Sequence, residues 1–130
     1  MKKQTKFLEL KKIFHRLHSS KGCLWDREQT HQTLIPYLRE ESEELISAIE
    51  SQDYSHMKEE LGDLLIQVMF HSQIASKNGR FDVEDVIDVL IKKLKRRHPH
   101  VFGNKKVKSS REIISNWNKI KEKERRSKKV

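Results

Sequence analysis

The stretch EESEELISAIESQDYSHMKEELGDLLIQVMFHSQIA, residues 40–75, decides the fold of this chain. Its apolar residues recur every three or four positions, which is the period of an amphipathic helix and not of a strand. The pattern is interrupted once, where Asp53 or Ser55 can cap the start of a new helix. The stretch therefore predicts two helices that pack antiparallel across a short turn near residues 52–55.

The same period continues on both sides of this stretch, and the 130-residue chain holds only 4 Gly and 2 Pro. Because no alternating pattern typical of strands is present, the expected fold is all-α, a helical bundle of about five helices. The expected helices run from about Thr5 to His18, from between Thr30 and Thr33 to about Ser51, from just after Asp53 or Ser55 to Asn78, from Val83 to about Arg97, and from Ser109 or Ser110 into the basic end of the chain.

Each expected helix carries one apolar stripe that should face the core. On the two central helices the stripes consist of Leu34, Leu38, Leu45 and Ile49, and of Met57, Leu61, Leu64, Leu65 and Val68. On the next helix the stripe consists of Val86, Ile87, Leu90, Ile91 and Leu94. The second central helix also has an adjoining polar stripe of Glu60, Asp63, Gln67 and His71. A histidine in such a setting is more often a hydrogen-bonded structural residue than a ligand.

The composition limits how this core can be built. Hydrophobic residues make up 35% of the chain and charged residues 36%, so the apolar stripes are narrow. We therefore expect residues 1–130 to form a single domain whose bundle is completed by dimerisation, as a homodimer or a higher homo-oligomer. The segment KEKERRSKK at residues 121–129 is expected to be a mobile basic tail.

The cysteine content and the hydropathy indicate the compartment. A lone cysteine, Cys23, excludes an internal disulfide and fits a reducing environment. No apolar run approaches the ~20 residues needed to cross a bilayer. The expectation is a cytoplasmic protein with no membrane segment.

The two signs of charge are segregated along the chain. The formal net charge is +9, yet from Glu40 to Asp63 nine acidic residues face one basic residue, whereas from Lys92 to Val130 sixteen basic residues face three acidic ones. An excess of positive charge suggests an anionic partner. A uniform RNA-coating surface would not show an acidic centre of this kind, so nucleic acid is not the favoured partner.

The acidic centre has the spacing of a metal site. Glu41 and Glu44 lie one helical turn apart, and so do Glu60 and Asp63. If the two helices pack antiparallel, both pairs point into one cleft, where four carboxylates suit Mg²⁺ or, as a substitute, Mn²⁺. The alternative is that such acidic runs are solvated helix surface, since glutamate is a good helix former.

A divalent cation in this cleft would serve a particular chemistry. Bound near a phosphate, it bridges phosphoryl oxygens, screens their charge from an attacking water and lowers the pKa of that water. These are the requirements of phosphoanhydride hydrolysis by metal-activated water.

Four segments carry a family resemblance: CLWDREQTH at residues 23–31, EESEELISAIE at 40–50, KEELGDLLIQVMFHSQIA at 58–75 and KKLKRRHPHVFG at 92–103. With them the chain closely resembles the MazG-type nucleoside triphosphate pyrophosphohydrolases. The family signature, Glu-Glu-x-x-Glu followed a helical hairpin later by Glu-x-x-Asp, is met by Glu40, Glu41, Glu44, Glu60 and Asp63. Leu24 stands where the family usually has proline, away from these acids.

The resemblance implies a dimeric all-α protein that hydrolyses NTPs and dNTPs, with Mg²⁺, to the monophosphate and pyrophosphate. It also implies that Glu41, Glu44, Glu60 and Asp63 hold the metal, while Glu40 supports a ligand or positions the water. The physiological task would be sanitation of the nucleotide pool or adjustment of its size.

Basic and aromatic residues near the end of the chain are the expected nucleotide-binding groups. Lys93 and Arg97 lie one turn apart and match family positions that contact phosphate. Trp117 and Lys121 match a family Trp-x-x-x-Lys pair, with a ring for the base and a cation for phosphate. The alternatives are a solubilising basic helix end for the first pair and core packing for Trp117. Trp25 is either a base platform or a loop anchor.

Two other protein classes fit parts of the sequence. A basic helical nucleic-acid-binding module would account for the sequence pI of about 9.7 but leaves the acidic pairs unexplained. A di-iron bundle needs Glu-x-x-His pairs, and neither Glu44 nor Glu60 has histidine three residues later.

Overall fold

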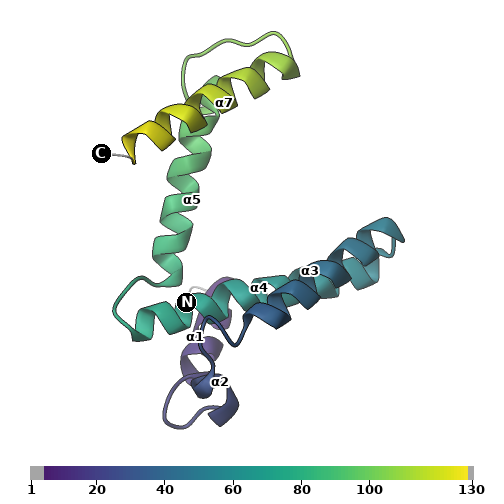
Figure 1. Ribbon diagram of the computed structural model, residues 1–130, viewed down its shortest axis with the longest axis vertical. Coiled ribbons are helices and arrows are strands. Elements are labelled where there is room, and N and C mark those ends of the chain that lie inside the picture. The colour runs from purple at the N-terminus through teal and green to yellow at the C-terminus, as the bar shows by residue number, and fades with distance from the viewer. Residues whose placement is uncertain (1–4, 129–130) are drawn as a thin grey trace. The chain divides into compact units, whose positions relative to one another are not determined.

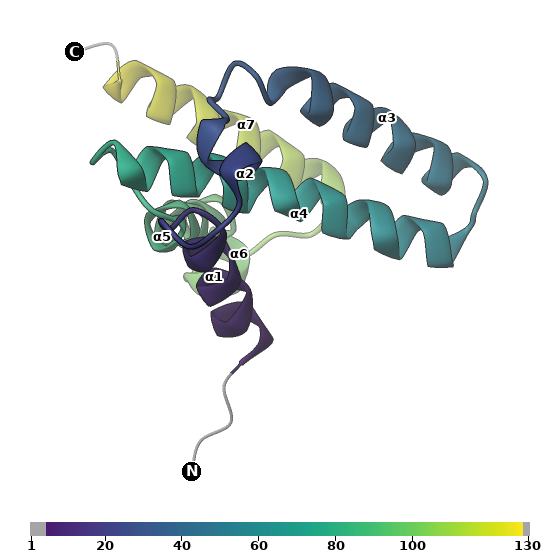
Figure 2. The same ribbon diagram turned by 90° about the horizontal axis from the view of Figure 1, so that it is seen from below.

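A computed structural model describes residues 5–128, and within that range the chain is helical with no strand. The all-α prediction is therefore confirmed. The described helices are α1 (Lys6–Leu17), α2 (Leu24–Glu28), α3 (Ile35–Glu50), α4 (Tyr54–Lys77), α5 (Val83–Arg97), α6 (Pro99–Phe102) and α7 (Ser110–Ser127) (Figures 1 and 2). Five of them correspond to the five expected helices. The short helices α2 and α6 were not predicted.

The chain separates into two compact units, an N-terminal unit of residues 1–83 and a C-terminal unit of residues 84–130. The border falls at the start of α5. All eight buried hydrophobic residues of the described chain lie in the N-terminal unit: Phe14, Leu34, Ala48, Met69, Phe70, Ile74, Ala75 and Val83. Among the described residues after Val83, no hydrophobic side chain is buried.

The centre of the N-terminal unit is the antiparallel pair of α3 and α4, which lie side by side in both views (Figures 1 and 2). The turn between them places Gln52 at φ 57°. Asp53 then caps α4, because its side chain accepts a hydrogen bond from the backbone N–H of His56 at 3.1 Å. At the other end, Gly79 stops the helix in the left-handed region, with φ 68°. Both ends of α4 agree with the prediction.

The start of α3 differs from the prediction. The helix begins at Ile35 with no side-chain cap, not at a threonine between Thr30 and Thr33. The reason is that the backbone N–H of Thr30 donates to Thr33 Oγ1 at 2.9 Å, and that of Thr33 donates to Thr30 Oγ1 at 3.2 Å. These side chains therefore close a local turn and do not cap a helix.

The core lies where α1 and α2 meet the second half of α4. Phe70 packs edge-on against Phe14, His18 and Trp25, with ring centroids 6.1, 4.9 and 6.1 Å away. Trp25 also meets Tyr37 of α3 edge-on at 5.8 Å. These contacts favour the loop-anchor interpretation of Trp25.

The expected inward face of α4 is partly reversed within this chain. On α4, Leu61, Leu65 and Val68 are 50%, 43% and 42% exposed, whereas Glu60 and Gln67 of the adjoining polar stripe are only 5% and 7% exposed. The prediction that this apolar stripe packs into the core of the chain is wrong for these three residues, whereas Met57 and Leu64 of the same stripe are half-buried. Hydrophobic period locates a stripe on a helix, but it does not say whether the partner belongs to the same chain.

The C-terminal unit shows the same pattern. Leu90, Ile91 and Leu94 of α5, expected to face inward, are 49%, 45% and 41% exposed. Helix α7 is capped by Ser109, as predicted, and continues to Ser127 through most of the basic segment that we expected to be a tail. The last two residues lie outside the described range. Among the described helices, none has the length and apolarity needed to cross a bilayer.

Candidate functional site

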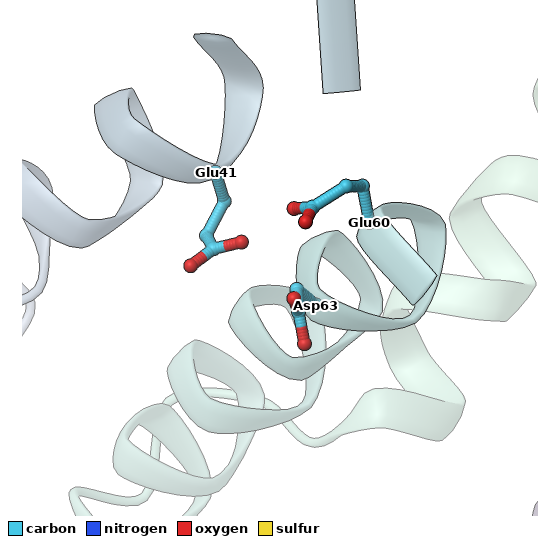
Figure 3. A group of neighbouring side chains, drawn as sticks. All are labelled: Glu41, Glu60 and Asp63. Atoms are coloured by element: carbon cyan, nitrogen blue, oxygen red, sulfur yellow. The ribbon is translucent and has the colours of Figure 1, made fainter. Parts of the chain in front are cut away.

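Three of the four predicted metal ligands come together on the α3–α4 pair. Glu41 projects from α3, while Glu60 and Asp63 project from one face of α4, and Figure 3 shows the three side chains pointing toward one another. Each offers one carboxylate oxygen, and these oxygens all lie within 4.8 Å of one another. The antiparallel packing predicted from the sequence is what brings the two helices' acids to one place.

The burial of these acids is unfavourable unless a positive group lies beside them. Glu60 is only 5% exposed, and its Oε1 lies 3.0 Å from His56 Nε2. Its other oxygen, Oε2, is buried with no donor, and so is Oε2 of Glu41. A buried carboxylate oxygen without a partner costs free energy, which a bound cation would remove.

The electrostatics give the same result. Burial raises the pKa of Glu41 to about 7, with further contributions from a carboxyl hydrogen bond to Glu60 and from the charges of Asp63, Glu44 and Glu60. The pKa of Glu44 is also raised, first by a carboxyl hydrogen bond to Glu60 and then by the charge of Glu60. Raised pKa values of this kind are expected where several carboxylates lie close together, and a bound cation would lower them again.

The remaining predicted acids border this group. Glu44 is half-buried and interacts with Glu60, although it does not belong to the set of three oxygens within 4.8 Å. Glu40 is exposed, and its charge contributes to the raised pKa of Glu44. The donor set consists of carboxylate oxygens, which suit hard divalent cations such as Mg²⁺ and Mn²⁺.

The predicted nucleotide-binding residues all lie in the C-terminal unit. Arg97 Nη2 donates to Glu124 Oε1 at 2.8 Å, and the guanidinium lies over the ring of Trp117, 5.2 Å from its centroid. His98 meets the same ring edge-on at 5.1 Å. The ring of Trp117 therefore contacts the side chains of Arg97 and His98. Its binding to a base stays a prediction.

The other two predicted cations, Lys93 and Lys121, are half-buried and exposed respectively, and their contact with phosphate stays a prediction. Their neighbours Lys92, Lys95 and Arg96 are exposed to solvent. Arg96 Nε donates to Glu124 Oε2 at 2.6 Å, and Lys92 Nζ pairs with Asp88 at 2.8 Å. The basic end of α5 is thus partly neutralised within the C-terminal unit.

Sequence reasoning missed two contacts in these clusters. His56 lies one helical turn before Glu60, a spacing that could have indicated their hydrogen bond. Glu124 lies seven residues after Trp117, two turns along the same helix face, and is one of only three acids between residues 92 and 130. Its partners on α5 could not be read from the sequence, because they depend on how two separate helices meet.

His71 is hydrogen-bonded, as predicted for a structural residue. Its Nδ1 lies 2.8 Å from Nδ1 of His31, and the two rings stack with centroids 5.0 Å apart. Burial, and then the proximity of His31, lower the pKa of His71. One ring of the pair must be neutral at its Nδ1 to accept the hydrogen bond, so His71 serves as a packing partner of His31.

A family model described as the MazG nucleotide pyrophosphohydrolase domain matches residues 29–102, a range that contains all five signature acids. The chain belongs to this family. The resemblance predicted from the sequence is confirmed. Helices α3, α4 and α5, which carry the acids and the first pair of cations, therefore lie within the part of the chain that matches the family.

Two curated proteins that are similar to this chain are named nucleoside triphosphate pyrophosphohydrolases. The chain is 52% identical over 123 residues to the nucleoside triphosphate pyrophosphohydrolase/pyrophosphatase MazG of Thermotoga maritima, covering 95% of this chain and 47% of that protein. It is 46% identical over 107 residues to the nucleoside triphosphate pyrophosphohydrolase of Escherichia coli K12, covering 82% and 41%. The chain thus spans less than half the length of these curated relatives.

A solved structure also matches this MazG chain. The crystal structure of a mazG-related protein from Thermotoga maritima superposes with a TM-score of 0.70 at 27% sequence identity, covering 87% of this chain and 96% of that one. The fold is therefore shared with a protein described as mazG-related.

The contact of Glu124 with two arginines predicts a pH dependence. Hydrogen bonds from Arg97 and Arg96 lower the pKa of Glu124 from 4.5 to about 2. A carboxylate with a lowered pKa in the folded state stabilises the fold fully above its unfolded pKa and loses that contribution as pH falls toward its folded pKa. The stabilisation should therefore be complete above pH 4.5 and decline between pH 4.5 and 2.

Thermal unfolding followed by circular dichroism between pH 7 and pH 2.5 checks this expectation. Relative to the wild type, Glu124→Gln should lower the free energy of unfolding at pH 7 by about 1–3 kcal/mol, because it breaks a charge-assisted contact. The difference between the two proteins should shrink as the pH falls below 4.5. A difference that stays constant over this range would contradict the assignment.

Proposed function

We propose that this MazG chain hydrolyses nucleoside and deoxynucleoside triphosphates to the monophosphate and pyrophosphate, with Mg²⁺ as cofactor and Mn²⁺ as a possible substitute. The observation that carries the proposal is the group of Glu41, Glu60 and Asp63, whose oxygens converge from two helices. The names of the relatives from Thermotoga maritima and Escherichia coli support the reaction. We further propose sanitation of the nucleotide pool as its physiological task.

In this proposal Glu41, Glu44, Glu60 and Asp63 hold the metal. When bound there, a divalent ion supplies Lewis-acid stabilisation of phosphoryl oxygens and a water with a lowered pKa. His56 keeps one oxygen of Glu60 in place through their 3.0 Å contact, leaving the unpartnered Oε2 for the ion.

The cations hold the substrate. We propose that Lys93 and Arg97 bind the triphosphate, and that Trp117 and Lys121 bind the base and a phosphate. The family match at residues 29–102 crosses the border between the two units, which supports one functional domain built from both. The alternative of a nucleic-acid-binding module is less favoured, because it leaves the converging carboxylates of Glu41, Glu60 and Asp63 unexplained.

We also propose that the chain works as a homodimer. The support is the exposed apolar stripe of Leu61, Leu65 and Val68, together with the exposed stripe of α5 and the absence of buried hydrophobic residues after Val83 in the described chain. Isolated exposed leucines are ordinary, but whole amphipathic stripes left open on two helices are typical of a subunit interface.

Leu65→Glu should dissociate this dimer. A charge at the centre of an apolar interface costs about 3 kcal/mol or more, so the dissociation constant should rise by at least roughly 10²-fold. Light scattering coupled to gel filtration should give twice 15.6 kDa for the wild type and 15.6 kDa for the variant. Ser55→Glu, at an exposed polar position of α4, is the control and should stay dimeric. A wild-type mass of 15.6 kDa would refute the homodimer.

The proposed reaction is tested by incubating the full chain with each of the common NTPs and dNTPs. Pyrophosphate release should require Mg²⁺ and stop when EDTA is added. Turnover that continues in EDTA would count against the metal site, and release of orthophosphate as the first product would count against the reaction.

A further inference from the structure

Glu124 is placed to control the direction in which Arg97 points. Its carboxylate accepts from Arg97 Nη2 at 2.8 Å and, more weakly, from Arg97 Nε at 3.4 Å. The same carboxylate accepts from Arg96 Nε at 2.6 Å. The side chains of Glu124 and Arg97 are each only 16% exposed, so water competes little for this contact.

The geometry leaves one edge of the Arg97 guanidinium available. A guanidinium presents its five N–H groups in a rigid planar fork. Glu124 accepts hydrogen bonds along the edge formed by Nε and Nη2, and the central guanidinium carbon lies over the ring of Trp117, 5.2 Å from its centroid. The edge formed by the two terminal nitrogens is the one that remains, and it matches the bidentate geometry of a phosphate.

The neighbouring acid on the same helix makes a useful contrast. Glu122 is 49% exposed and pairs with Arg125 and Arg126 of its own helix at 3.7 and 3.6 Å. Such exposed contacts within one helix are worth little. Glu124 instead reaches two arginines on α5, 27 and 28 residues earlier in the chain.

We propose that Glu124 is a positioning residue, which holds Arg97 against Trp117 so that the terminal nitrogens of its guanidinium face the phosphates of the nucleotide. The proposal rests on the proposed function, in which Arg97 binds the triphosphate. Glu124 itself touches no substrate.

Electrostatics and positioning predict opposite results for Glu124→Gln. Removing a negative charge beside two arginines makes the cluster more positive, which by itself should tighten the binding of an anion. Losing the contact that orients Arg97 should weaken that binding instead. The guanidinium would no longer be held in the orientation that forms two hydrogen bonds to phosphate, so binding would have to order it at a cost in entropy. Glu122→Gln makes the same change of charge without touching Arg97.

The test is calorimetric titration of the full chain with inorganic triphosphate in the presence of Mg²⁺. We expect Glu124→Gln to weaken binding about tenfold, and Glu122→Gln to leave it unchanged or slightly tighter. Glu124→Asp, which keeps the charge but shortens its reach, should also weaken binding. With nucleotide as substrate, Glu124→Gln should raise KM by a similar factor and change kcat little. Unchanged or tighter binding in Glu124→Gln would overturn the proposal.

A double-mutant cycle separates positioning from a general effect on folding. A lysine ammonium has no edges to orient, so in Arg97→Lys the further change Glu124→Gln should cause no additional loss of triphosphate binding. If Glu124→Gln weakens triphosphate binding equally in the wild type and in Arg97→Lys, Glu124 serves only to hold α7 against α5, which overturns the proposal. If Arg97→Ala binds triphosphate as tightly as the wild type, the proposed role of Arg97 fails, and the positioning role fails with it. Weaker binding in Arg97→Ala with no change in Glu124→Gln overturns positioning alone.

Discussion

Replacing Asp63 by Asn should nearly abolish pyrophosphate release, lowering kcat/KM by about 10²–10³-fold or more. Asp63 supplies one of the three oxygens within 4.8 Å of one another, and an amide offers the metal a neutral and weaker ligand in its place. A metal site contributes several kcal/mol of transition-state stabilisation, and each 1.4 kcal/mol is a factor of about ten. The measurement is steady-state kinetics over a range of Mg²⁺ concentrations.

The same variant should fold at least as well as the wild type. Asn has the shape of Asp, and the change removes one negative charge from a group whose members repel one another. Its melting temperature without metal should therefore equal or slightly exceed that of the wild type, while its stabilisation by Mg²⁺ should be lost. Glu59→Gln, at an exposed position of the same helix, is the control and should keep full activity. Metal-dependent turnover that survives in Asp63→Asn would show that the ligand assignment is wrong.

Phe70→Ala should cost about 3–5 kcal/mol of folding free energy. Phe70 is 5% exposed and meets the rings of Phe14, His18 and Trp25, so its loss opens a cavity where α1, α2 and α4 meet. A loss of this size is a large part of the 5–15 kcal/mol that stabilises a typical domain. Equilibrium unfolding in urea, followed by circular dichroism, measures it.

Phe81→Ala provides the comparison for this prediction. Phe81 is 44% exposed and lies between α4 and α5, so truncating it should cost less than about 1 kcal/mol. Equal losses in the two variants would mean that the aromatic contacts of Phe70 do not form the centre of the core. Because Phe70 lies about two helical turns beyond Asp63 and is not one of the converging carboxylates, activity per folded molecule should change little.

The helices of this chain were predictable from local signals. The sequence left the cap of α4 open between Asp53 and Ser55, and Asp53 is the one that caps the helix. The left-handed stop at Gly79 was correctly placed, because both signals follow from the chemistry of one or two residues. The start of α3 was not, because Thr30 and Thr33 have the right chemistry for a cap but bond to each other. Residues 24–28 and 99–102 form helices too short to leave a periodic pattern.

The faces of the helices were harder to predict than their ends. Glu60 is 5% exposed while Leu61 is 50% exposed, although hydrophobicity alone places leucine inside. Helical period marks Leu61 and Leu65 as an apolar surface, and only packing shows that this chain does not cover it. Glu60 is buried where α3 and α4 face each other, and there its carboxylate lies beside those of Glu41 and Asp63.

The candidate site was predictable as a set of acids but not as a geometry. Spacing alone paired Glu41 with Glu44 and Glu60 with Asp63. The packing of α3 against α4 then brings carboxylate oxygens of three of these four residues together. The contact of Glu124 with Arg97 spans 27 residues and two helices, so no local pattern could reveal it. Contacts within a helix can be read from spacing, whereas contacts between helices depend on a packing angle that the sequence does not state.

Phosphorus NMR of the products tests the central claim most directly. ATP is mixed with the full chain and Mg²⁺, and the resonances are followed until substrate is consumed. The account predicts equal amounts of AMP and pyrophosphate, with no ADP at any time and no reaction when EDTA replaces the metal. Accumulation of ADP and orthophosphate would contradict it, because the bond broken would then be the one between the β and γ phosphates.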